Sequence, residues 1–98
     1  MNEFQFNAEV WLYPGEAAWH FVSLPKNISK QIKKEFGDMA RGWGSLPVNV
    51  KINNTKWKTS MFPESKSDTY ILPLKLEVRK LEDIKSGDNI NVSISLIM

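Results

Sequence analysis

Hydrophobic and polar residues alternate with a period of two through most of the chain, which is the pattern of strands with one buried face. Turn-forming residues separate the alternating stretches. The strands predicted in this way cover residues 3–13, 18–24, 46–52, 57–62, a short segment ending at Leu72, and 90–96.

The turns between these stretches predict how the strands connect. Pro14-Gly15-Glu16 joins the first two strands into a hairpin, because proline presets φ and glycine permits a positive φ. Asn53-Asn54 fits a tight hairpin turn, since asparagine tolerates the left-handed conformation. We expect a glycine-rich loop over 37–47, a polar loop over 63–68 and a turn at Ser86-Gly87-Asp88.

One segment breaks the alternation and predicts a helix of about three turns after Pro25. Its apolar residues Ile28, Ile32 and Phe36 recur every four positions, and lysines occupy the other faces. The residues suited to cap it are Asn27 or Ser29 at the start and Gly37 as the C′ glycine at the end.

The segment between the polar loop and the last turn fits two structures. Alternating apolar residues from Leu72 to Val78 fit a strand, whereas Leu74, Val78 and Leu81 also lie at helical spacing, with Pro73 suited to the first helical turn. We favour a strand that ends at Leu72, followed by a helix over about 74–81.

Six short strands with tight turns, one or two helices and no βαβ rhythm predict a mainly β fold. We expect a single domain over residues 1–98, built as a small closed or partly open β-barrel, with a sandwich as the alternative. Closure of a barrel also removes exposed strand edges.

The composition fits a globular domain, with 42% hydrophobic and 24% charged residues. The chain has no cysteine, no segment that resembles a signal peptide and no apolar run of the ~20 residues that span a membrane. We therefore expect a cytoplasmic protein. Its net charge of +2 is too small to indicate a nucleic-acid partner by itself.

The common catalytic and metal motifs are absent from the sequence. His20 is the single histidine, it sits in the middle of a predicted strand, and we expect it to be a hydrogen-bonded core or rim residue. Gly42-x-Gly44 is too short for a phosphate-binding motif. The carboxylates near the end of the chain, Glu77, Glu82 and Asp83, fit helix-surface ion pairs. We expect no catalytic residue, no cofactor and no metal.

The most informative group of residues combines cations, hydroxyls and tryptophan. An arginine beside a tryptophan in a glycine-rich loop suits an anion or a planar ligand. The alternative is that Trp43 plugs one end of the barrel while Arg41 pairs with an acidic neighbour. The candidate ligand-binding residues are Arg41, Trp43, Ser45, Thr59, Ser60, Lys75 and Arg79. Trp11 and Trp19, on the polar side of the first hairpin, would either extend an aromatic patch or cover a second packing face.

Five ordered blocks also carry a family resemblance over essentially the whole chain. They are Trp19-x-Phe21-Val22-x-Leu24-Pro25, Arg41-Gly42-x-Gly44-Ser45-x-Pro47-Val48, Trp57-x-Thr59-Ser60-x-Phe62-Pro63, Tyr70-x-Leu72-Pro73-x-Lys75 with Val78-Arg79, and Gly87-Asp88-x-Ile90-x-Val92. The chain thereby resembles a mainly bacterial family known as domain of unknown function number nineteen-oh-five. The resemblance implies a small pseudo-barrel, similar to the swapped-hairpin barrels of antitoxin and transition-state regulators, and implies no activity.

Three functions follow as hypotheses. The first is a non-catalytic module that binds a small anionic or polar ligand at the barrel mouth, where the seven candidate residues would converge. The second is a nucleic-acid-binding or regulatory domain, by analogy with the swapped-hairpin barrels. The third is a protein–protein interaction domain that uses Trp11, Tyr13 and Trp19. An enzyme is the least supported class.

Overall fold

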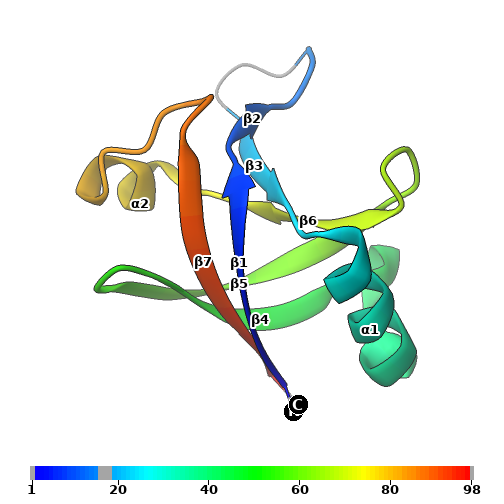
Figure 1. Ribbon diagram of the computed structural model, residues 1–98. Coiled ribbons are helices and arrows are strands. Elements are labelled where there is room, and N and C mark those ends of the chain that lie inside the picture. The colour runs from blue at the N-terminus through cyan, green and yellow to red at the C-terminus, as the bar shows by residue number, and fades with distance from the viewer. Residues whose placement is uncertain (1, 16–18, 98) are drawn as a thin grey trace.

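A computed structural model describes residues 2–15 and 19–97 (Figure 1). Seven strands, two α-helices and two 3-10 turns make up this part of the chain. In chain order they are β1 Glu3–Glu9, β2 Trp11–Leu12, β3 His20–Ser23, α1 Lys26–Phe36, the 3-10 turns η1 Gly37–Met39 and η2 Gly42–Gly44, β4 Leu46–Ile52, β5 Thr55–Glu64, β6 Thr69–Pro73, α2 Leu76–Leu81 and β7 Asn89–Leu96.

The strands form one curled antiparallel sheet in the order β1-β7-β4-β5-β6-β3-β2. The sheet curls because the chain changes its pairing partner at two places. The chain bends at Val10, so that β1 pairs with β7 while β2 pairs with β3. Strand β5 pairs first with β4 and then with β6. The mainly β, partly open barrel is therefore confirmed, with seven strands instead of about six.

The core lies inside this curl, where the inward-facing residues of the alternating strands meet. Val48, Met61, Leu72 and Val92 come from four different strands and are fully buried. Helix α1 adds Ile32, which is also fully buried, and so closes one side of the barrel. The period-two pattern thus selects the inner face of the sheet, as expected for strands with one buried side.

The predicted first hairpin is wrong for most of its length. Residues Glu3–Glu9 pair with β7 at the other end of the chain, and only Trp11 and Leu12 pair with β3. Val10 marks the change, because it is buried and its N–H donates to the carbonyl of Asp88 at 2.8 Å. Residues 16–18, which include Glu16 of the predicted turn and the predicted start of the second strand, lie outside the described residues.

The β5–β6 hairpin is longer than predicted. Strand β5 continues to Glu64 and β6 begins at Thr69, so that the loop predicted over 63–68 shrinks to the turn 65–68. Asp68 adopts a positive φ of 55° in this turn. The predicted turn at Asn53-Asn54 is confirmed, with Asn53 at a φ of 52°.

Both predicted helices are present, but their ends differ from the prediction. No side chain caps α1 at Pro25, and Gly37 has a φ of −57°, because the chain continues there into η1. The Ser29 hydroxyl instead accepts a hydrogen bond from the Tyr70 N–H at 3.1 Å. Helix α2 begins at Leu76, two residues later than predicted, because Pro73 still belongs to β6 and Lys75 takes the N-cap position.

Candidate functional site

A cavity lies where β5 separates from β6. These strands pair only between Phe62–Glu64 and Thr69–Ile71, and from there they diverge toward α2 (Figure 1). The opening between them, about 1070 Å³ in volume, is hereafter called the β5–β6 cleft. Its lining comes from β3, β5, β6, α2 and the two loops that follow β2 and precede β4.

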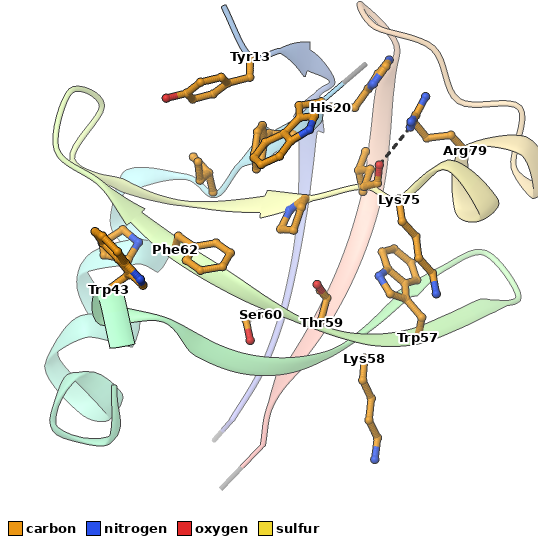
Figure 2. A pocket seen from close by; sticks show the side chains of 16 residues that line it. Tyr13, His20, Trp43, Trp57, Lys58, Thr59, Ser60, Phe62, Lys75 and Arg79 are labelled. Carbon is orange, nitrogen blue, oxygen red and sulfur yellow. Dashed lines mark hydrogen bonds between the residues drawn. The ribbon is translucent and has the colours of Figure 1, made fainter. Parts of the chain in front are cut away.

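The two ends of the cleft differ in chemistry. Trp43 and Phe62 lie at one end, whereas Trp57, Lys75 and Arg79 lie at the other, with Thr59 and Ser60 between them (Figure 2). The other apolar residues of the lining are Tyr13, Trp19, Phe21, Pro63, Ile71, Pro73 and Leu74. A ligand that fills the cleft would therefore meet aromatic rings at both ends and cations only at the end that holds Lys75 and Arg79.

Five of the seven residues selected from the sequence line this cleft, namely Trp43, Thr59, Ser60, Lys75 and Arg79. Arg41 and Ser45 do not. Instead they form the base of the loop that carries Trp43, since the Arg41 N–H donates to the Ser45 carbonyl at 2.9 Å. The Gly44 N–H in turn donates to the Arg41 carbonyl at 2.9 Å. These two residues shape the site without lining it.

Trp43 is held outward by an unusual backbone. Its φ is +64°, a conformation that costs a bulky residue of order 1–3 kcal/mol, and its side chain is 93% exposed. The next residue, Gly44, has a φ of +72°, and a Cβ there would lie 2.9 Å from Pro63 Cγ. The predicted alternative in which Trp43 plugs the barrel is wrong, and Arg41 forms no ion pair with the described residues.

Trp19 and Phe21 also line the cleft, and the sequence did not single them out as ligand-binding residues. Trp19 is 58% exposed, and its ring lies 6.2 Å from the ring of Phe21, which is buried. The ring of Trp11, which lies outside the cleft, is 5.2 Å from that of Phe21, and its indole N–H donates to Ser23 Oγ at 3.0 Å. The signal available in the sequence was a second set of aromatic residues at the polar positions of these strands.

The charged residues in the described lining of the cleft are all basic. Lys75 is exposed, and Arg79 is half-buried with its Nε donating to the Leu74 carbonyl at 3.0 Å. Lys58 also belongs to the lining, although its side chain points away from the cleft (Figure 2). None of the described lining residues is a carboxylate. His20 is half-buried at the upper edge, in agreement with the predicted rim position.

Glu82 takes a different role from the predicted helix-surface pairing. Its carboxylate accepts hydrogen bonds from Asn53 Nδ2 at 2.6 Å and from the Thr55 hydroxyl, which ties α2 to the β4–β5 turn. These hydrogen bonds, that from Asn53 first, lower the pKa of Glu82. The contact fixes α2, and with it Arg79, against the far end of the cleft.

Two further features of the described residues bear on function. No group of three or more histidine, aspartate or glutamate side chains is placed to hold a metal ion among them. None of the helices in residues 2–15 and 19–97 is long and apolar enough to cross a membrane.

The architecture defines a class of small, partly open β-barrels with a cleft at the point where the sheet divides. The sequence identifies the family to which the chain belongs. The family model described as domain of unknown function (DUF1905) matches residues 6–94, and the chain belongs to this family. A comparison with curated proteins found no match.

Proposed function

We propose that the domain is a non-catalytic binding module, and that its β5–β6 cleft takes a small ligand with an anionic group and a planar apolar part. The observation that supports the proposal is the combination of aromatic rings and cations around one cavity without a described carboxylate. Binding sites are commonly concave and mostly apolar, with a few polar groups that fix the orientation of the ligand.

Each end of the cleft suits one part of such a ligand. Trp43 and Trp19 offer exposed ring faces, on which a planar group stacks favourably. Lys75 and Arg79 can donate charge-assisted hydrogen bonds to a carboxylate or phosphate, and such bonds are about twice as strong as neutral ones. The hydroxyl of Thr59 lies between the two ends and can bind the polar middle of the ligand, whereas the Ser60 side chain points to the same side of β5 as Lys58.

A thermal-shift screen with small anions tests the proposal. The panel contains benzoate, indole-3-acetate, nucleoside monophosphates and inorganic phosphate at low salt. A ligand present at about 100 times its dissociation constant adds about 2.7 kcal/mol of stability, which raises the Tm of so small a domain by roughly ten degrees or more. We expect aromatic anions to shift the Tm more than inorganic phosphate does.

Paired lysine variants locate the binding. Lys75→Ala should weaken binding of the best aromatic anion about tenfold, whereas Lys34→Ala, an exposed lysine on α1 away from the cleft, should leave the affinity unchanged. Equal effects of the two variants would indicate nonspecific charge attraction and would contradict the proposal.

The nucleic-acid hypothesis is tested by the same screen with short DNA and RNA oligonucleotides. Binding through phosphates weakens steeply as salt increases. A Tm shift with oligonucleotides alone, lost between low and moderate salt, would favour that hypothesis over a small ligand.

A further inference from the structure

Where it forms one wall of the cleft, strand β5 has an edge that pairs with no other strand of the described residues. Its first part, Thr55–Met61, pairs with β4, and its last part, Phe62–Glu64, pairs with β6. Within residues 2–15 and 19–97, no strand pairs with the other edge of Thr55–Met61. Such an edge presents a row of unpaired N–H and C=O groups to its surroundings.

The register shows which backbone groups face the cleft. In β4 the carbonyl of Pro47 accepts a hydrogen bond from Ile97 N–H, so the odd-numbered residues of β4 face β7 and the even-numbered ones face β5. Their partners in β5 are odd-numbered, as in Val48 with Thr59. Hydrogen-bonding directions alternate along a strand, and therefore Lys58 and Ser60 direct their N–H and C=O groups into the cleft.

The opposite wall lacks the N–H donor that a full ladder with β5 would need at this point. Continuing the register from Phe62 opposite Ile71 would place Ser60 opposite Pro73. Between β3 and β6, the His20 carbonyl accepts a hydrogen bond from the Leu74 N–H, and the Tyr70 carbonyl accepts one from the Leu24 N–H. The backbone N–H and C=O groups of the even-numbered residues of β6 therefore face β3, and the backbone of Pro73 faces the cleft. Proline has no N–H to give to Ser60. The sheet therefore divides at this point and leaves the β5 edge open.

The charge and shape around this edge indicate what pairs with it. Lys56 and Lys58 stand on the open stretch of β5, and lysines on an edge disfavour pairing with a second copy of the same strand. Lys75 and Arg79 add positive charge across the cleft, while Phe62 supplies an apolar surface beside the edge. A strand that fits this edge alternates carboxylates with apolar side chains.

We infer that the ligand of the β5–β6 cleft is an extended acidic segment of a partner protein, which adds as a strand to β5 along Lys56–Ser60. This inference rests on the proposed role of the cleft as a binding site, and it names a peptide segment as the occupant in place of a free small molecule. In this mode of recognition the main chain provides much of the affinity and alternate side chains provide specificity. Five residues of β5 at about 3.4 Å each match a peptide of about five residues.

An array of pentapeptides tests the inference. The probes are acetylated and amidated peptides with glutamate at alternate positions and every apolar residue in turn at the others, with a matched array in which lysine replaces glutamate. We expect binding to glutamate peptides and none to their lysine counterparts. Binding to neither array would overturn the inference.

The hydrogen-bonding pattern of the best peptide then distinguishes strand addition from simple charge attraction. N-methylation of the amides that face β5 should weaken binding at least tenfold, whereas N-methylation of the alternate amides should not. In the complex, hydrogen exchange of the Lys58 and Ser60 amides should slow at least tenfold, while the Thr59 amide, already paired with β4, should change little. A uniform response to N-methylation, or unchanged exchange at Lys58 and Ser60, would overturn the inference.

A variant provides the corresponding change in the protein. Ser60→Pro removes the N–H that faces the cleft and leaves the β4 ladder intact, since proline is tolerated on a strand edge. It should fold and lose peptide binding. Binding of indole-3-acetate distinguishes failure of the peptide inference from failure of the proposed function. If it binds and depends on Lys75 while no peptide binds, the proposed function stands and the inference fails; if neither binds, both fail.

Discussion

Replacement of Gly44 by alanine tests the account of how the Trp43 loop is built. Gly44 combines a positive φ of +72° with a close approach to Pro63, where an added Cβ would lie 2.9 Å from Cγ. Gly42 is the matched control, because it lies in the same loop, its added Cβ would meet no atom within 4 Å, and its φ is not in the left-handed region.

The expected magnitude follows from these two features. A left-handed conformation costs an L-residue roughly 1–2 kcal/mol, and the contact with Pro63 forces the ring or the loop to shift as well. We expect Gly44→Ala to destabilise the domain by about 2 kcal/mol, which corresponds to a Tm lower by roughly 8–16 °C. Gly42→Ala should change the stability by about 0.5 kcal/mol or less.

Urea unfolding of the two variants, followed by far-UV circular dichroism, measures this difference. The slope of the transition should match that of the wild type in both variants, because neither substitution changes the buried surface appreciably. Equal stability of Gly44→Ala and Gly42→Ala would refute the reasoning, since the backbone strain and the Pro63 contact would then carry no cost. Gly44→Ala should also weaken any ligand that stacks on Trp43.

Three further predictions concern the core and the titrating groups. Met61 is fully buried, so Met61→Ala should lower the free energy of unfolding, measured with urea, by about 2–5 kcal/mol. Met39 is 52% exposed, and Met39→Ala should change that free energy little. Burial raises the pKa of Tyr70 above its ordinary value of 10.0, so the stability that its neutral form contributes is complete below pH 10.0 and is lost as the pH rises through the raised value. Tm measured against pH should therefore fall less steeply on the alkaline side in Tyr70→Phe than in the wild type or in Tyr13→Phe. Hydrogen bonds lower the pKa of Glu82 below 4.5, and hence its contribution is present above pH 4.5 and is lost as the pH falls through the lowered value. Glu82→Gln should flatten the acid side of the same Tm profile, and an unchanged acid side would contradict this role.

Local patterns in the sequence predict most of the elements but not the partners of each strand. Alternation identifies β4 and β7 with nearly the observed bounds, because each strand has one face in the core. The same alternation continues unbroken through Val10, and nothing local reveals that the chain there leaves β7 and joins β3. Pairing between the two ends of the chain is a property of the folded barrel and not of either segment.

The sequence predicted only part of the candidate site, because the site also depends on how distant segments come together in the fold. Thr59, Ser60, Lys75 and Arg79 are polar residues within or beside apolar strands, and the divergence of β5 from β6 brings them to one cavity. Arg41 was selected because it lies beside Trp43 in the sequence, yet Trp43 lines the cleft and Arg41 does not. Trp19 and Phe21 were not selected because the aromatic residues at the polar positions of these strands fit a second packing face as well as a ligand site.

The indole N–H signals of the four tryptophans give the most direct test of the central claim, that the β5–β6 cleft is a binding site. Trp19, Trp43 and Trp57 line the cleft, whereas Trp11 lies outside it with its indole N–H bonded to Ser23. In a titration with indole-3-acetate or with an acidic pentapeptide, followed by nitrogen–proton correlation spectra, we expect saturable shifts of the Trp43 and Trp57 signals and little change at Trp11. Shifts of equal size at all four tryptophans, or no saturable shift with either probe, would contradict the claim.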